Sequence, residues 1–241
     1  VYAVEGSRIA DTAEELIAEN GLSGQITLLR GYSHAITLPQ RCDLLVSEMV
    51  GHYGIEEDIC EIFADARERL LTPCARIIPQ TLDLFLAPVQ VPEFQEACDR
   101  YTALDAQVGV PFFQRTRIPA LIRSSYIGDF ASYTRRIVAQ PRCIASIDIT
   151  SASTSDLSVG IHYHIKKSGI IDGCIGWFAC DLGYGIRIQT SPWDEKTHWQ
   201  QCFFPHDPVE VRLGDNVLVK FSYKKPDDER LPRFSLNIEK I

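Results

Sequence analysis

The sequence predicts an α/β fold in which a partial doubly wound, Rossmann-like parallel sheet is followed by an antiparallel β-barrel. Residues 1–79 alternate apolar strand-like runs with helical stretches, the order that produces parallel strands joined by helical crossovers. Residues 80–241 contain many short runs in which apolar and polar residues alternate, as in antiparallel strands with one wet face. The change of pattern near Pro79 sets the expected domain boundary.

The first half of the chain is expected to contain three strands and two helices. The strands cover residues 2–4, 26–29 and 43–47, and the helices cover residues 9–20 and 59–70. The first helix should end at Asn20 and Gly21, because glycine tolerates the left-handed conformation that commonly ends helices. The second helix is indicated by an apolar stripe that recurs at helical spacing from Ile59 to Leu70.

The second half is expected to be a β-barrel or sandwich with one insertion. Its strands are expected at residues 82–87, 143–149, 157–165, 173–180, 185–189 and 217–223. Residues 93–101 have a helical pattern, and the stretch from there to about residue 130 has no regular period. We expect this region to be an insertion rather than part of the core.

The composition of the 241-residue chain is that of an ordinary globular protein, with 45% hydrophobic and 23% charged residues. Its net charge of -8 argues against direct nucleic-acid binding, which needs clustered Lys and Arg, and suits a basic partner. No apolar run approaches the roughly twenty residues of a membrane span, and no signal peptide is visible. Because Val1 already lies in a strand-like run, we expect a segment upstream of it.

Eight cysteines are spread along the chain without the spacing of a zinc site. Several lie in apolar runs, which favours reduced core thiols and a cytoplasmic location, with a nuclear one also open for a eukaryotic protein. His162 and His164 would share one face of a strand, but no third ligand is near them in the sequence. No metal is therefore expected.

Glu48 and Glu57 lie near the two ends of the segment SEMVGHYGIEED, directly after the strand expected at residues 43–47. Open α/β sheets usually place their active sites at the carboxyl ends of the strands. The spacing does not match a helical repeat, so only a loop that doubles back at Gly51 and Gly54 would bring the carboxylates together. A guanidinium, which forms bidentate hydrogen bonds to carboxylates, is then the natural partner. A solvated acidic loop is the alternative.

Glu5 ends the first expected strand. In nucleotide-binding doubly wound sheets, an acid at the end of the second strand holds ribose hydroxyls, about twenty residues after a glycine-rich loop. If Glu5 is that acid, the first strand and its glycine loop lie upstream of Val1. A surface glutamate that starts a helix is equally compatible with this residue alone.

Four segments resemble protein arginine methyltransferases, and they occur in the family's order along nearly the whole chain. These segments are VYAVEGS, SEMVGHYGIEED, RERLLTPCARIIPQT and TSPWDEKTHWQQ. The paired glutamates resemble the family's double-E loop, and Thr197-His198-Trp199 resembles its THW loop. The resemblance implies methyl transfer from S-adenosylmethionine to a guanidino nitrogen of a protein arginine, leaving S-adenosylhomocysteine and requiring no metal. Glu48 and Glu57 would clamp the guanidinium and leave the reacting nitrogen nucleophilic.

The same resemblance implies a role for each remaining site residue. His198 would be the titratable group near the departing proton or, alternatively, a residue that orders Trp199. The substrate channel would be shaped by Met49, Thr197 and Trp199. The cofactor would be bound by Glu5 at the ribose, by Gly31, Ser33 and His34 along the adenine, and by Asp58.

Several features depart from the family pattern. His34 stands where the family commonly has an acid that accepts from the adenine amine, and Met49 where asymmetrically dimethylating members usually have tryptophan. Glu56 is a rival of Glu57 for the second clamp position. The aspartate that pairs with the family's THW histidine comes from an N-terminal helix that this sequence lacks. The product, whether mono-, symmetric or asymmetric dimethylarginine, stays open.

Residues 92–125 align with the family's dimerisation arm, which implies a homodimer. The expected substrate is an arginine-containing basic protein or peptide. Two other functions are compatible with the residues: a catalytically inactive relative that binds arginine peptides or the cofactor, and a methyltransferase for a small guanidino compound. Without a glycine loop, the 241 residues alone are expected not to turn over.

Overall fold

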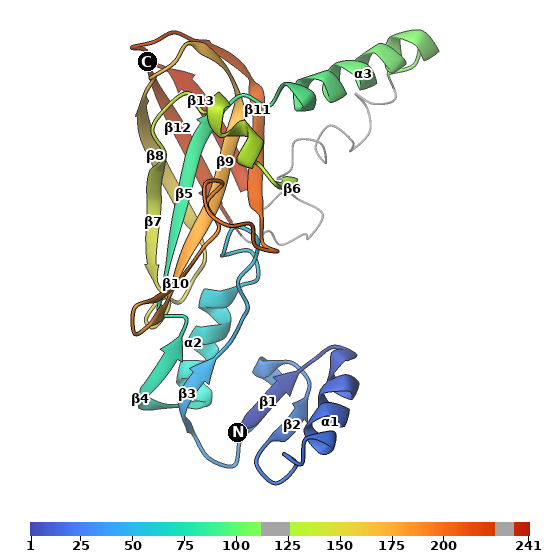
Figure 1. Ribbon diagram of the computed structural model, residues 1–241, viewed down its shortest axis with the longest axis vertical. Coiled ribbons are helices and arrows are strands. Elements are labelled where there is room, and N and C mark those ends of the chain that lie inside the picture. The colour runs from blue at the N-terminus through green and yellow to red at the C-terminus, as the bar shows by residue number, and fades with distance from the viewer. Residues whose placement is uncertain (112–125, 225–233) are drawn as a thin grey trace.

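The computed structural model describes residues 1–111, 126–224 and 234–241. The molecule is elongated, with the α/β part at one end and the β domain at the other (Figure 1). Strands and helices alternate up to Ile78, and from Thr81 onward the described regular structure is mainly β, with helix α3 (Pro92–Val108) as the longest exception. The change of pattern expected at Pro79 lies between these two residues. None of the helices in the described ranges combines the length and apolar character needed to cross a membrane.

The α/β part contains two separate pairs of parallel strands. The pairs are β1 (Tyr2–Glu5) with β2 (Thr27–Arg30), and β3 (Cys42–Val46) with β4 (Leu71–Ile78). Helix α1 (Ile9–Glu19) connects β1 to β2, and helix α2 (Ile59–Arg69) connects β3 to β4. The expected parallel strands and helical crossovers are confirmed. Within residues 1–111, however, no ladder joins β1 to β3, so the two pairs do not form one continuous sheet.

The two strand pairs leave apolar side chains uncovered. Val46 is 64% exposed and Leu44 43% exposed on β3, and Val4 is 38% exposed on β1. On α2, by contrast, Ile59 and Phe63 are fully buried, so the apolar stripe read from the sequence does face a core. The buried core of the described residues therefore lies around α2 and in the β domain.

In its described residues, the β domain contains two antiparallel sheets. The larger has the order β6-β11-β9-β5-β7 with β10 paired to β9, and the smaller has the order β13-β12-β8. The strands are β5 (Thr81–Val89), β6 (Tyr126–Gly128), β7 (Arg142–Asp148), β8 (Leu157–His164), β9 (Gly169–Gly183), β10 (Ile186–Gln189), β11 (Gln201–Val211), β12 (Asn216–Tyr223) and β13 (Phe234–Lys240). The antiparallel arrangement is confirmed. Across the described residues the barrel is not closed, because no ladder joins the two sheets.

The barrel stays open where β11 passes β13. Pro205 and Pro208 in β11 have no backbone N–H to donate, and the register of β11 with β9 shifts between Pro205 and Val209. In place of a ladder, the backbone N–H of Ile238 in β13 donates to His206 Nε2 at 3.1 Å. The two sheets are therefore linked here by a side chain.

Helix α3 (Pro92–Val108) leads away from the β domain (Figure 1). It is longer than the helix expected at residues 93–101. Pro92 suits the start of a helix because its missing N–H has no helical partner there, and Gly109 ends the helix at φ 70°. The remainder of the expected insertion includes residues 112–125, which lie outside the described residues.

Candidate active site

The segment from Glu48 to Glu57 doubles back on itself, as the sequence predicted. Gly51 and Gly54 form an antiparallel bridge, and the N–H of Gly54 donates to the carbonyl of Gly51 at 2.9 Å. Gly54 has a φ of +92°, and a Cβ at this position would lie 2.7 Å from the side chain of Leu82. A residue with a side chain would therefore meet both backbone strain and a clash.

Tyr53 anchors this loop in the core of the β domain. Its ring is fully buried and packs edge to face against Phe204, Phe221 and Phe234, with centroid distances of 5.0, 5.6 and 5.8 Å. Its hydroxyl donates to the carbonyl of Phe85 at 3.0 Å. Burial of such a side chain stabilises the fold by about 2 to 3 kcal/mol from apolar area. The β domain thus holds a loop that emerges from β3.

Glu57 lies near Glu48, whereas Glu56 is part of the loop's interior. Burial, and then the negative charge of Glu48, raise the pKa of Glu57, while His52 acts in the opposite direction. Glu56 accepts a hydrogen bond from the N–H of Tyr53 at 2.6 Å, and burial raises its pKa. Its side chain lies so close to Gly51 that a Cβ there would be 2.4 Å from Glu56 Cδ. This geometry favours Glu57 over Glu56 as the partner of Glu48.

Trp199 joins the Thr197–Trp199 segment to the acidic loop by two hydrogen bonds. Its indole N–H donates to the carbonyl of Val50 at 2.7 Å, and its own carbonyl lies 2.7 Å from His52 Nδ1. Its ring also packs edge to face on Phe178, with centroids 5.7 Å apart. The two motifs, 140 or more residues apart in the chain, therefore lie in contact.

The other residues that the resemblance implies for this site are next to Trp199 or Glu48 in the chain. The ring of His198 is exposed and lies against Trp199, with centroids 3.9 Å apart. Thr197 Oγ1 is buried and has no hydrogen-bond partner in the described part of the chain. Met49 is half-buried beside Glu48. Across the described ranges, no carboxylate forms a hydrogen bond or ion pair with the His198 ring.

Glu5, Gly31, Ser33 and His34 form a second group at the carboxyl ends of β1 and β2. The carbonyl of Glu5 accepts from the N–H of Gly31 at 2.9 Å, and its carboxylate accepts from the N–H of Ser7 at 2.6 Å. The hydrogen bond from Ser7 lowers the pKa of Glu5, which favours an ionised carboxylate. His34 stacks on the exposed ring of Tyr32, with centroids 5.7 Å apart and planes 10° apart.

Arg69 in α2 holds this second group in place. Its guanidinium donates to the carbonyls of Ser33 and Ile36 at 2.8 and 2.9 Å and pairs with Asp65 at 2.5 Å. An ionised carboxylate beside two flat rings fits the ribose and adenine of a nucleoside. Asp58 lies apart from this group: it is the N-cap of α2, next to the acidic loop, with a φ of 59°.

The sequence did not single out His52 or Arg69. His52 stands between the two glutamates, and a titratable residue inside a suspected acidic loop was a usable signal. Arg69 gave no such signal, because a basic residue in the last turn of a helix is favoured on any surface helix.

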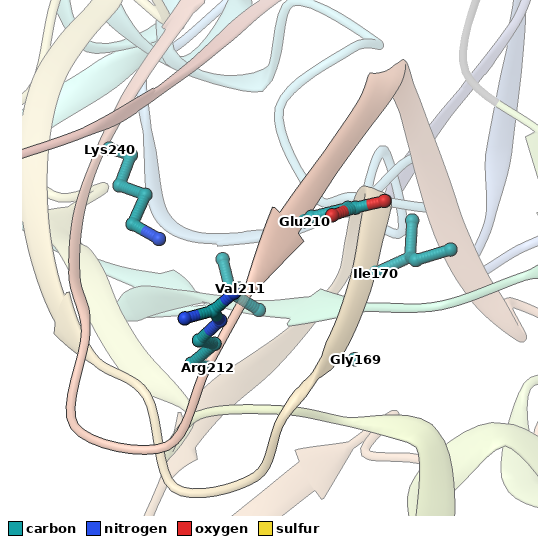
Figure 2. A pocket seen from close by; sticks show the side chains of 6 residues that line it. All are labelled: Gly169, Ile170, Glu210, Val211, Arg212 and Lys240. Atoms are coloured by element: carbon teal, nitrogen blue, oxygen red, sulfur yellow. The ribbon is translucent and has the colours of Figure 1, made fainter.

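A separate pocket of about 370 Å³ lies at the opposite end of β11 from the Thr197–Trp199 segment. Figure 2 shows its lining residues, among them Glu210, Arg212 and Lys240. The ammonium of Lys240 pairs with Asp215 at 2.6 Å. This pocket includes none of the residues of the two groups above. Nor does the described part of the chain contain a cluster of three or more His, Cys, Asp or Glu suited to a metal.

A family model for the arginine methyltransferase oligomerization subdomain matches residues 112–239, more than half of the chain. The chain belongs to the arginine methyltransferase family. Protein arginine N-methyltransferase PRMT10 of Arabidopsis thaliana is 24% identical over 274 residues, covering 99% of this chain and 70% of the relative. A probable histone-arginine methyltransferase CARM1 of Oryza sativa subsp. indica is 27% identical over 237 residues, covering 90% of this chain and 43% of the relative.

Two solved structures of the family have the same fold as this chain. The crystal structure of Arabidopsis thaliana protein arginine methyltransferase 10 matches with a TM-score of 0.84 and 24% identity, covering 100% of this chain and 77% of that one. A Trypanosoma brucei PRMT1 enzyme-prozyme heterotetrameric complex with AdoHcy matches with a TM-score of 0.76 and 16% identity, covering 100% and 81%. The likeness extends over both the α/β part and the β domain.

Proposed function

We propose that the protein transfers a methyl group from S-adenosylmethionine to a guanidino nitrogen of a protein arginine. The observation that carries this proposal is the approach of Glu48 and Glu57 in a loop whose turn is fastened to Trp199. Membership of the arginine methyltransferase family supports the reaction class. The named relatives support the same reaction.

The acidic loop would bind the arginine and polarise it. Because burial and then the charge of Glu48 raise the pKa of Glu57, the site favours a cation that neutralises both carboxylates. A guanidinium does so with hydrogen bonds to each, which draws positive charge toward the bound nitrogens and leaves the third more nucleophilic. Bound S-adenosylmethionine would supply the methyl group on a sulfonium. No covalent bond to the protein is required, since positioning and electrostatics supply the advantage.

The transferred methyl group must be balanced by loss of a proton from the guanidinium. Arginine is too weak an acid to lose this proton beforehand, so the proton leaves during or after transfer. His198 is exposed beside Trp199 and is suited to take it or to pass it to solvent. A role for His198 solely in ordering Trp199 is the other assignment.

Glu5, Gly31, Ser33 and His34 would hold the nucleoside of the cofactor. The ionised carboxylate of Glu5 would accept from the ribose hydroxyls, and the rings of Tyr32 and His34 offer a flat apolar face to the adenine. The Trypanosoma brucei complex contains AdoHcy, which supports this cofactor class. Isothermal titration of the full-length protein with S-adenosylhomocysteine, compared with Glu5→Gln, measures the contribution of the carboxylate.

The clamp is tested with three single substitutions in the full-length protein. Glu48→Gln and Glu57→Gln should each abolish transfer of a radioactive methyl group to an Arg-Gly-rich peptide while leaving the thermal unfolding midpoint within a few degrees. Glu56→Gln is the matched control, since its side chain accepts from Tyr53 N–H inside the loop and should leave transfer largely intact. Full activity in Glu48→Gln or Glu57→Gln would refute the clamp.

A catalytically inactive protein that binds arginine peptides or the cofactor is the second candidate. Binding of S-adenosylmethionine without turnover would select this candidate. Transfer to a free guanidino compound but not to peptides would select the small-molecule methyltransferase.

Helix α3 is proposed to dock on a second copy of the chain. Tyr101, Leu104 and Val108 follow each other at helical spacing and are 43%, 51% and 69% exposed. The match to an oligomerization subdomain supports self-association. Leu104→Asp should convert a dimer to a monomer in light scattering, while Ala103→Asp, on an adjacent face, should not.

A cytoplasmic location remains a proposal, supported by the eight cysteines, all of which are free thiols. Imaging of a tagged full-length protein tests it.

A further inference from the structure

We propose that His52 is a positioning residue, which donates a hydrogen bond to the carbonyl of Trp199 and so holds the Thr197–Trp199 segment against the loop that carries the two glutamates. This inference rests on the proposed function, because it concerns the shape of the same site. The sequence pattern assigned no role to His52. The geometry does, because His52 Nδ1 lies 2.7 Å from the Trp199 carbonyl oxygen.

The direction of this hydrogen bond follows from its acceptor. A backbone carbonyl oxygen can only accept, so Nδ1 must carry the proton whether the imidazole is neutral or charged. The bond therefore fixes the tautomer of neutral His52 with its proton on Nδ1. The donor remains in place through any change in the charge of the ring.

The bond from His52 is one of two that hold Trp199 at opposite ends of the residue. The indole N–H donates to the carbonyl of Val50, and the Trp199 carbonyl receives the bond from His52. Val50 and His52 flank Gly51, where the acidic loop turns. One bond orients the side chain of Trp199 and the other orients its backbone, so together they fix both the ring and the path of the chain.

The path of the chain at Trp199 determines where its neighbours lie. His198 precedes it with its ring against the indole, at a centroid distance of 3.9 Å, and Gln200 N–H closes a turn onto the carbonyl of Thr197 at 3.3 Å. Loss of the donor would leave this turn joined to the loop that carries Glu48 and Glu57 by one of these two hydrogen bonds, the one from the indole to Val50.

The imidazole also lies on the acidic side of the loop. Its proximity lowers the pKa of both Glu56 and Glu57, against the upward effect of burial. His52 therefore keeps these carboxylates closer to ionised while it holds Trp199. An apolar side chain could not serve both purposes.

The test compares His52→Asn with His52→Leu in the full-length protein. The amide nitrogen of asparagine branches from Cγ as Nδ1 does in histidine, so Asn keeps a donor near the Trp199 carbonyl, whereas Leu fills similar space without one. The first readout is hydrogen exchange of the Trp199 indole N–H by NMR. We expect exchange about 5- to 10-fold faster in His52→Leu, as loss of one hydrogen bond predicts, and near-native exchange in His52→Asn.

The second readout is steady-state methyl transfer. In His52→Leu the KM for an arginine peptide should rise about 10-fold, while the KM for S-adenosylmethionine stays within about twofold, and His52→Asn should restore most of the peptide affinity. A His52→Leu protein with native indole protection would overturn the proposal, as would His52→Asn exchanging as fast as His52→Leu. If even the unsubstituted protein transfers no methyl group, the proposed function fails, but the exchange measurement still decides the role of His52.

Discussion

Asp172 in β9 provides a sharp test of how the base of α3 is held. Its side chain is 2% exposed and accepts a hydrogen bond from the N–H of Val91, the N-cap residue of α3, at 2.7 Å. Burial raises the pKa of Asp172 from 3.8 to about 6, against the lowering effect of the Val91 hydrogen bond. We predict that Asp172→Asn stabilises the protein at neutral pH.

Proton linkage gives the sign and the size of the change in the free energy of unfolding. Between pH 4 and pH 6 the folded state binds more protons at Asp172 than the unfolded state, so the free energy of unfolding falls as pH rises through this window. A shift from 3.8 to about 6 corresponds to about 3 kcal/mol at about 1.4 kcal/mol per unit. Asparagine keeps an oxygen for Val91 N–H and carries no charge. We therefore expect a gain of up to about 3 kcal/mol at pH 7.5 and little difference at pH 4.

Urea unfolding at a series of pH values from 4 to 7.5 measures this difference. Asp148→Asn is a control of opposite sign, because the hydrogen bond from the Thr150 side chain lowers the pKa of Asp148 and its charge therefore stabilises the folded state above pH 4. The reasoning would be refuted if the free energy of unfolding of Asp172→Asn and that of the unsubstituted protein differed by the same amount at every pH. A loss of stability in Asp172→Asn at pH 7.5 would also refute it.

Three further predictions concern the two groups of site residues. Tyr53→Ala should lower the free energy of unfolding by about 3 to 5 kcal/mol in urea titrations, since it empties a buried aromatic position; a cost under about 1 kcal/mol would contradict the anchor. Gly54→Ala should lower the thermal unfolding midpoint more than Gly185→Ala does. Both glycines have a positive φ, but only at Gly54 would a Cβ lie against Leu82. Equal decreases in the midpoint would count against the clash. Arg69→Gln should weaken S-adenosylhomocysteine binding about 10-fold in calorimetry, because residues 33–36 lose the hydrogen bonds from the Arg69 guanidinium. An unchanged affinity would show that residues 33–36 keep their conformation without these hydrogen bonds.

The sequence predicted the course of the acidic loop but not the directions of its side chains. The glycines at positions 51 and 54 predicted a reversal, and the reversal is present. The sequence left Glu56 and Glu57 as rivals for the second clamp position, because adjacent acids differ only in the side of the chain to which they point. In the structure the N–H of Tyr53 donates to Glu56, so this carboxylate points into the loop.

The β domain was predicted in outline and missed at its edges. β12 alternates apolar and polar residues and was found almost to the residue. β11 was missed because Pro205 and Pro208 interrupt the pattern that marks a strand, and these prolines also have no N–H to donate beside β13, where no ladder forms. Closure of a barrel depends on backbone hydrogen bonds between strands that are distant in sequence, and the local hydrophobic pattern does not predict such bonds.

The burial of Tyr53 in the β domain makes it difficult to separate the two parts of this protein. A cut near residue 79 separates the acidic loop from the strands that enclose its tyrosine. The β fragment would then carry an empty aromatic socket lined by Phe204, Phe221 and Phe234, and the α/β fragment would expose the ring that fills it. The two halves are therefore poor modules for separate expression or for grafting between relatives. If the two fragments are mixed, their association requires the ring of Tyr53 to be buried again among these phenylalanines.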